Sequence, residues 1–85
     1  MDSTDKCMNL ARAIIVKSLN LISPYPEKLE IYKVPQWDSF GQLQVILGLE
    51  RELGVRITDE AVFETLTSQE CIANFINSTI SGDGR

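Results

Sequence analysis

An aspartate and a serine, Asp38 and Ser39, stand at the start of a strongly helical stretch in the middle of this chain of 85 residues. The N-terminus of a helix presents backbone N–H groups without intrahelical partners and the positive end of the helix dipole, and it therefore suits a phosphate. A serine hydroxyl at this point can carry a phosphate ester without burying a charge. The same residues also fit an ordinary helix start. Asp38 or Ser39 can serve as the N-cap, and Ser39-Phe40-Gly41-Gln42 has the form of a capping box.

The other side chains offer little catalytic chemistry. The sequence contains no histidine, so the chain cannot form a Ser-His-Asp or Cys-His mechanism by itself. Its two cysteines, Cys7 and Cys71, have no metal-binding or redox spacing, and we expect small, buried or half-buried thiols without a disulfide. Calcium-loop spacing and a glycine-rich phosphate loop are also absent. These observations argue against an enzyme and against a metal site.

Charge is unevenly distributed along the chain, whose formal net charge is −4 at pH 7. Residues 1–38 contain five acids and five bases, whereas residues 39–85 contain seven acids and three bases. This balance disfavours nucleic acid binding, and it suits either a basic protein partner or a solvated acidic surface. No apolar run reaches membrane-spanning length. The first five residues lack the pattern of a signal peptide, so we expect a cytoplasmic protein.

The residues before Ser39 predict one helix followed by a long connection. Apolar residues recur at helical spacing from about Asp5 to Ile22, and prolines at 24 and 26 end the pattern. The loop 24–38 is long for a compact domain, its alternation at 29–31 is too short for a strand, and we allow a short helical turn near Glu27. The apolar side chains expected to fasten this loop across the helices are Leu29, Ile31, Tyr32, Val34 and Trp37.

The stretch that begins at Ser39 predicts a helix to about Leu53. Gly48 marks a point of close packing, and Gly54 is a suitable C-terminal stop. The side chains expected on the inner stripe of this helix are Phe40, Leu43, Ile46, Leu47, Glu50 and Leu53, with Glu50 near the edge.

Two further helices are predicted after a brief extended linker at 55–57. Residues 58–60 open a short helix through about Glu64, with acidic side chains in its first turn. Residues 67–70, Thr-Ser-Gln-Glu, form a capping box that opens the last helix, which runs to about Ile80. The side chains expected to face inward are Val62, Phe63, Leu66, Cys71, Ile72, Phe75, Ile76 and Ile80.

The sum of these elements is an all-α fold with three main helices, a short third helix and a long loop between the first two. We expect one domain over residues 1–85, with its core in about 5–80 and a flexible tail at 81–85. A chain of this size has a small core, lacks room for a deep catalytic cleft, and is expected to be a monomer.

Residues 37–76 resemble the acyl carrier protein family. Residues 38–40, Asp-Ser-Phe, are similar to the Asp-Ser-Leu signature that opens the second helix of that family. Residues 43–60 are similar to that helix, its acidic end, the following isoleucine and an acidic short helix, and residues 72–76 are similar to the final helix. Residues 1–36 agree in helix placement and in the long first loop, but they contain no specific motif.

The resemblance implies a four-helix bundle of the acyl carrier type, in which Ser39 is the attachment point of 4′-phosphopantetheine from coenzyme A. The arm ends in a thiol that carries acyl or aminoacyl groups as thioesters and presents them to partner biosynthetic enzymes. The implied partners are a phosphopantetheinyl transferase and the enzymes that load and transfer the cargo. For Asp38 the family supports a role in modification, with the transferase and its magnesium ion, beside its alternative as a helix cap.

Members of this family commonly contact partners through acidic residues along the second helix. Here Gln42 and Gln44 occupy exposed positions that are often acidic, and Arg51 interrupts Glu50 and Glu52. This departure favours a specialised pathway, such as polyketide, nonribosomal peptide or polysaccharide modification, over ordinary fatty acid synthesis. The residues assigned to partner binding through the resemblance are Trp37, Phe40, Gln42, Gln44, Glu50, Glu52, Asp59 and Glu60.

Several positions keep two interpretations. Core packing is the favoured interpretation of Phe40, and Trp37 either covers the base of the arm or packs beneath the first loop. A space between the second and third helices either shelters a bound chain or, as we favour, is plain core. The candidates for lining it are Leu43, Leu47, Val62, Phe63, Leu66 and Ile72. The alternative function is a small helical adaptor that binds a protein partner without a prosthetic group, with Ser39 as a cap.

Overall fold

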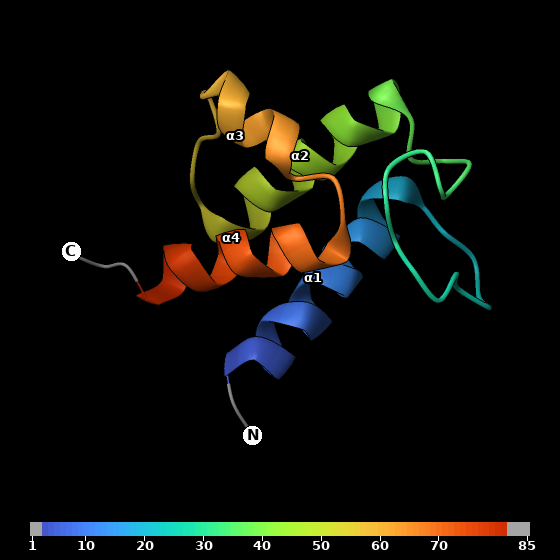
Figure 1. Cartoon of the computed structure of the whole chain (residues 1–85), viewed down its shortest axis with the longest axis horizontal. Coiled ribbons are helices and arrows are strands. Elements are labelled where there is room, and N and C mark those ends of the chain that lie inside the picture. The colour runs from blue at the N-terminus through green and yellow to red at the C-terminus, as the bar shows by residue number, and fades with distance from the viewer. Residues whose placement is uncertain (1–2, 82–85) are drawn as a thin grey trace.

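The computed structural model describes residues 3–81, and over that range it contains four helices and no strand (Figure 1). The helices are α1 (Ser3–Leu19), α2 (Ser39–Leu53), α3 (Glu60–Thr65) and α4 (Gln69–Ser81). The all-α prediction, with three main helices and a short third one, is confirmed. The predicted flexible tail lies outside the described residues except for Ser81, which ends α4.

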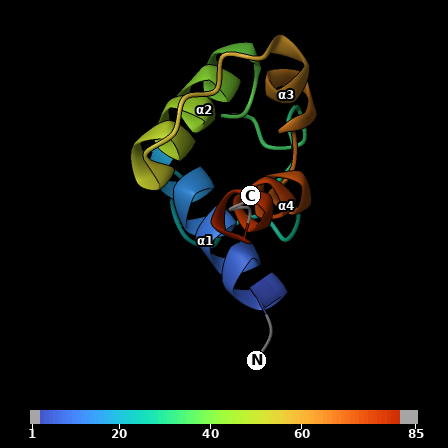
Figure 2. The ribbon, with the colours of Figure 1, turned by 90° about the vertical axis from the view of Figure 1, so that its left-hand side faces the viewer.

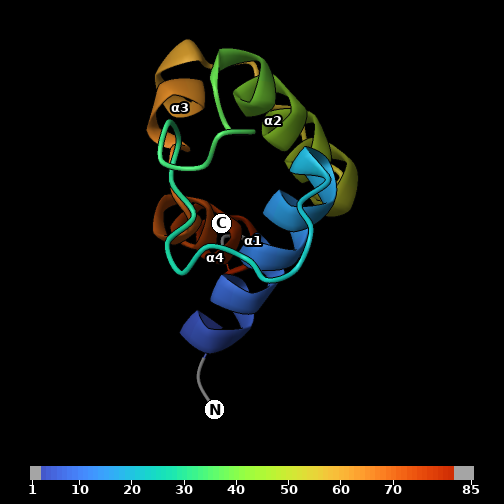
Figure 3. The same cartoon turned by 90° about the vertical axis from the view of Figure 1, so that its right-hand side faces the viewer.

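The first helix is the centre of the packing, since α1 contacts both α2 and α4. Figures 2 and 3 show α1 and α4 together, with α2 and α3 on one side of that pair. The long loop leaves the end of α1, passes α4 and returns to the start of α2. The buried apolar residues come from α1, α2, α4, the connections before α2 and Leu66, which follows α3: Cys7, Ala11, Ile14, Ile15, Leu19, Leu21, Leu29, Val34, Trp37, Val45, Ile46, Leu49, Leu66, Ile72, Ala73 and Ile76.

Helix α1 ends three residues earlier than the hydrophobic pattern predicts. Asn20 adopts a left-handed conformation (φ 56°), and the N–H of Leu21 donates to the carbonyl of Val16 at 3.0 Å. The N–H of Asn20 donates to Lys17 at 3.3 Å, which completes a Schellman ending of the kind that asparagine tolerates. Ile22, predicted on the inner stripe, is therefore outside the helix and 83% exposed.

The long loop is fastened to the start of α4 as well as to the core. Gln69 donates its N–H to the carbonyl of Leu29 at 2.9 Å, and the N–H of Ile31 donates to Thr67 at 2.8 Å. These bonds surround one isolated bridge between Glu30 and Ser68, so the expectation that residues 29–31 are too short for a strand is confirmed. Among the apolar loop residues, Leu29, Val34 and Trp37 are buried, Ile31 is half-buried and Tyr32 is exposed.

Two local predictions in this region are wrong. The helical turn allowed near Glu27 is absent there, and the chain turns instead after Glu30, whose carbonyl accepts from the N–H of Val34 at 3.2 Å. The capping box at 67–70 is displaced by one residue, because the Oγ of Ser68 accepts from the N–H of Cys71 at 3.2 Å. Ser68 is therefore the N-cap of α4, while the carbonyl of Thr67 accepts from the N–H of Ile31 in the loop.

Helix α2 has the predicted bounds but presents a different face to the core. Its buried residues are Gly41, Gln42, Val45, Ile46, Gly48 and Leu49. From the predicted stripe only Ile46 is buried, whereas Phe40, Leu43 and Leu47 are 69%, 44% and 42% exposed. The glycines explain why this face of α2 is the buried one, because it lies too close to α1 and the loop for larger side chains. A Cβ at Gly48 would collide with Ser18 Oγ, so the predicted close packing there is confirmed.

Candidate functional site

Ser39 is the first residue of α2, and its side chain is exposed. The cap of that helix is Asp38, whose backbone is extended (φ −107°, ψ −160°) and whose Oδ1 accepts from the N–H of Gly41 at 2.9 Å. The alternative in which Ser39 itself caps the helix, with Gln42 completing a capping box, is therefore wrong. The hydroxyl of Ser39 is left free of helix capping, and its partner is the phenol of Tyr32, with Oγ and Oη 3.2 Å apart.

Backbone donors at this helix start remain available for an anion. Gly41 gives its N–H to Asp38 Oδ1, and Gln42 gives its N–H to the carbonyl of Asp38 at 2.8 Å. Among the described residues, the N–H groups of Ser39 and Phe40 have no acceptor. A negative group attached to the hydroxyl of Ser39 would therefore lie beside two donors and the positive end of the helix dipole.

Trp37, the residue before them, positions the exposed residues Asp38 and Ser39. Its side chain is fully buried, which decides between its two predicted roles in favour of packing beneath the first loop. The backbone N–H of Trp37 donates to the carbonyl of Val34 at 2.8 Å, and the backbone carbonyl of Trp37 accepts from the N–H of Tyr32 at 2.7 Å. The buried indole and these two bonds fix the turn that leads into α2. Asp38 and Ser39 are therefore held outward by the burial of the residue before them.

Gln42 is a buried polar hub, although the sequence predicted an exposed position. Its Oε1 accepts from the indole Nε1 of Trp37 at 2.7 Å, and its Nε2 donates to the carbonyls of Phe63 and Leu66 at 2.9 and 2.8 Å. The side-chain amide thus joins the loop, α2 and the end of α3, and every buried side-chain polar atom among the described residues has a partner. Neither Gln42 nor Trp37 can contribute to an exposed partner surface in this structure.

A cavity of about 290 Å³ opens beside Ser39, between the first loop, the start of α2 and α3. Its lining residues are Ile31, Tyr32, Ser39, Gln42, Phe63, Glu64 and Thr67. Of the six residues predicted to line a space between α2 and α3, Phe63 reaches this cavity. Leu66 and Ile72 are plain core, as favoured, and Val62 is half-buried against that core, but Leu43 and Leu47 lie on the surface.

The remaining residues assigned to partner binding divide into structural and free groups. Glu50 is half-buried and accepts from the N–H of Ile57 at 2.7 Å, so it fixes the turn after α2. Asp59 caps α3 by accepting from the N–H of Ala61 at 2.9 Å, and Glu52 lies 3.9 Å from Lys17 Nζ. Phe40 and Glu60 are exposed, and Gln44 is half-buried.

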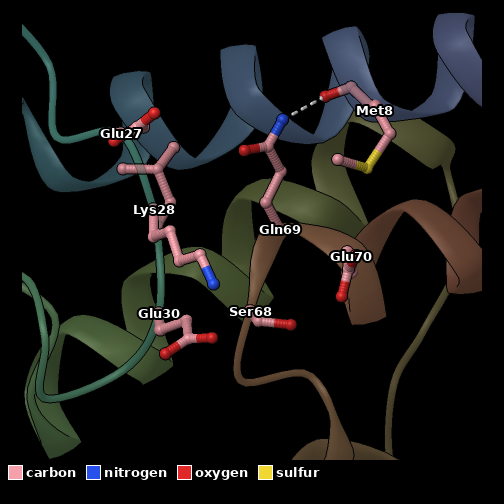
Figure 4. Close-up of a pocket in the computed structure, with 8 residues that line it drawn as sticks. Met8, Glu27, Lys28, Glu30, Ser68, Gln69 and Glu70 are labelled. Carbon is pink, nitrogen blue, oxygen red and sulfur yellow. Dashed lines mark hydrogen bonds between the residues drawn. The ribbon is translucent and has the colours of Figure 1, made fainter.

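A second pocket lies between α1, the loop and the start of α4 (Figure 4). Gln69 crosses it to donate its Nε2–H to the carbonyl of Met8 at 2.9 Å. Glu27, Lys28, Glu30 and Glu70 surround it, and its volume is about 200 Å³. Of the two cysteines, Cys7 is buried and Cys71 half-buried as predicted, and both are free.

Comparison with protein-family models, curated proteins and solved structures gave no match. Within residues 3–81, no set of three or more histidine, cysteine or acidic side chains is gathered for metal binding. None of the helices described there has the length and apolar character needed to cross a membrane.

Proposed function

We propose that this protein is an acyl carrier protein in which Ser39 carries 4′-phosphopantetheine. The proposal depends on one observation at the start of α2. Asp38 caps the helix, and the adjacent hydroxyl of Ser39 is exposed and takes no part in the cap. In this proposal the four helices have the acyl carrier arrangement, and the protein is a non-catalytic, monomeric, cytoplasmic carrier. The sequence resemblance over residues 37–76 supports the same function.

The residues around Ser39 fit the proposed group. The N–H groups of Ser39 and Phe40 suit a phosphodiester, and the cavity beside them offers apolar contacts from Ile31 and Phe63. When attached, the group supplies a thiol that holds acyl or aminoacyl cargo as a thioester. The task of this chain is to hold the attachment point outward on a rigid helix end.

The attachment step consumes coenzyme A and is catalysed by a phosphopantetheinyl transferase. Ser39 Oγ forms a bond to the phosphorus that bears the pantetheine. The bond from that phosphorus to the bridging oxygen of the pyrophosphate breaks, and 3′,5′-ADP leaves with the electron pair. The proton of the hydroxyl passes to a base that the transferase supplies, because this chain has no histidine to take it.

The surface of α2 that continues from Ser39 is largely apolar. Phe40, Leu43 and Leu47 form its exposed stripe along α2, and residues 39–49 contain no charged side chain. We infer that loading and transferring enzymes meet this helix through apolar contacts, while Glu52, Asp59 and Glu60 lie toward its margin. This chemistry supports a specialised pathway more than ordinary fatty acid synthesis.

Intact mass spectrometry tests the proposal directly. The purified protein is incubated with coenzyme A, Mg²⁺ and a broad-specificity phosphopantetheinyl transferase, and its mass should rise by one phosphopantetheinyl group. Ser39→Ala should abolish the rise, whereas Ser78→Ala, which alters an exposed serine on α4, should leave it unchanged. An unchanged mass with several transferases would favour the adaptor.

Substitutions at Asp38 separate the effect of its helix cap on stability from the effect of its charge on modification. Asp38→Ala removes the acceptor for the N–H of Gly41 and should lower the free energy of unfolding by about 0.5–2 kcal/mol. Asp38→Asn keeps an acceptor at the cap and should retain most of that stability, yet we expect slower modification because the carboxylate charge is lost. Urea denaturation and a timed mass assay measure the two effects. Equal modification rates for Asp38→Asn and the wild type would mean that Asp38 is only a cap.

A further inference from the structure

Tyr32 is the residue whose side chain lies against the hydroxyl of Ser39. Tyr32 is 71% exposed, so burial of apolar surface does not explain its position. Its Oη is 3.2 Å from Ser39 Oγ, and it lines the same 290 Å³ cavity. The first loop thus brings an aromatic hydroxyl onto the proposed attachment point from seven residues earlier in the chain.

The backbone around Tyr32 is fixed on both sides although the ring is exposed. Ile31 donates its N–H to the carbonyl of Thr67, and Tyr32 donates its own to the carbonyl of Trp37 at 2.7 Å. Tyr32 also adopts a left-handed conformation (φ 67°), which is uncommon for a bulky residue and is maintained here by the bonded turn. Val34 and Trp37 anchor that turn in the core. The phenol is therefore presented to Ser39 by an ordered element.

We propose that Tyr32 is a positioning residue for the phosphodiester on Ser39, an inference that depends on the proposed function. In the unmodified protein either hydroxyl can be the donor. Once Oγ is esterified it has no proton, so the phenol of Tyr32 becomes the donor and the anionic phosphodiester the acceptor. Hydrogen bonds to an ionised acceptor are roughly twice as strong as neutral ones. Tyr32 then holds the base of the arm on the loop side of α2, beside Ile31 and Phe63.

Tyr32→Phe tests this inference, with Tyr25→Phe as the matched control at the other tyrosine, whose ring lies 5.4 Å from the Arg12 guanidinium. Each protein is prepared unmodified and modified, and modification is verified by mass. The readouts are the ³¹P chemical shift of the phosphodiester and the change in Tm that modification causes. We expect Tyr32→Phe to shift the ³¹P resonance and to lose most of the modification-dependent change in Tm. Tyr25→Phe should match the wild type in both.

The outcomes distinguish this inference from the proposed function. If the wild type is modified and Tyr32→Phe matches it in ³¹P shift and in the Tm change, Tyr32 does not bind the phosphodiester, while the carrier function stands. If the wild type is not modified at all, both proposals fail together. A lower Tm of unmodified Tyr32→Phe would reveal a structural contribution, and the modification-dependent difference within each variant removes that contribution from the comparison.

Discussion

Trp37→Ala is expected to remove most of the stability of the domain. The indole is fully buried beneath the first loop, and truncation of a buried Trp to Ala typically costs about 3–5 kcal/mol. The loss of Nε1 also leaves Gln42 Oε1 without its 2.7 Å donor. A small domain has little stability in reserve, because it buries a smaller fraction of its surface on folding than a large domain does. Urea denaturation followed by circular dichroism should show a much lower midpoint or an unfolded protein.

Trp37→Phe is the control that separates packing from hydrogen bonding. It keeps a large apolar ring but removes the indole N–H, so the expected cost is about 1–3 kcal/mol from the unsatisfied Gln42 oxygen. Because Trp37 is the single tryptophan, its fluorescence in the wild type reports burial at this point without interference. A cost below about 1 kcal/mol for Trp37→Ala would contradict the central position that the structure gives to this side chain.

The ends of the helices were the part of the fold that the sequence predicted best. Asp38, Gly54 and Asp59 are residues whose chemistry acts locally: Asp38, one of two predicted caps, caps α2, Gly54 takes φ 66° at the predicted stop, and Asp59, expected in the first turn of α3, caps that helix. The early end of α1 was missed because Asn20 is a weaker signal than glycine for a left-handed residue.

The face that α2 buries could not be read from hydrophobicity. Phe40, Leu43 and Leu47 recur at helical spacing, and so do Val45 and Leu49 on a neighbouring face. Hydrophobic periodicity predicts the helix from either set, but the choice depends on how closely another segment approaches. Glycines at 41 and 48 permit that approach on the second face. Gln42 is buried because it lies on the same face of α2 as these glycines. Nothing local in the sequence indicated its three hydrogen bonds.

The face that α2 buries also determines which side chains surround the candidate site. When the glycine face of α2 turns inward, the larger apolar side chains are left outward beside Ser39. The prediction of Ser39 as an exposed residue at a helix start depended on local signals and agrees with the structure. The surrounding surface depended on tertiary packing, and it differs from the predicted one because Gln42 is buried whereas Leu43 and Leu47 are exposed.

Gly41→Ala is expected to lower the free energy of unfolding by about 1–3 kcal/mol, despite the better helix propensity of alanine. A Cβ at Gly41 would collide with the backbone carbonyl oxygen of Gln36 and lie 3.0 Å from Leu19 Cδ2. A backbone atom cannot move aside without shifting the turn that carries Trp37. Because the same turn leads into α2, modification of Ser39 should slow as well. Urea denaturation and the timed mass assay measure both effects.

Gly48→Ala is the comparison that shows whether a collision with a side-chain atom can be relieved where one with a backbone atom cannot. Its Cβ would collide with Ser18 Oγ, a side-chain atom, and otherwise meets Ile14 Cγ2 at an ordinary 3.4 Å. We expect Gly48→Ala alone to be destabilising, and Ser18→Ala to rescue it, since the double variant removes the colliding oxygen and gains about 1 kcal/mol of helix propensity. Ser18→Ala should not rescue Gly41→Ala. Rescue of both variants, or of neither, would contradict the close approaches that set the face of α2.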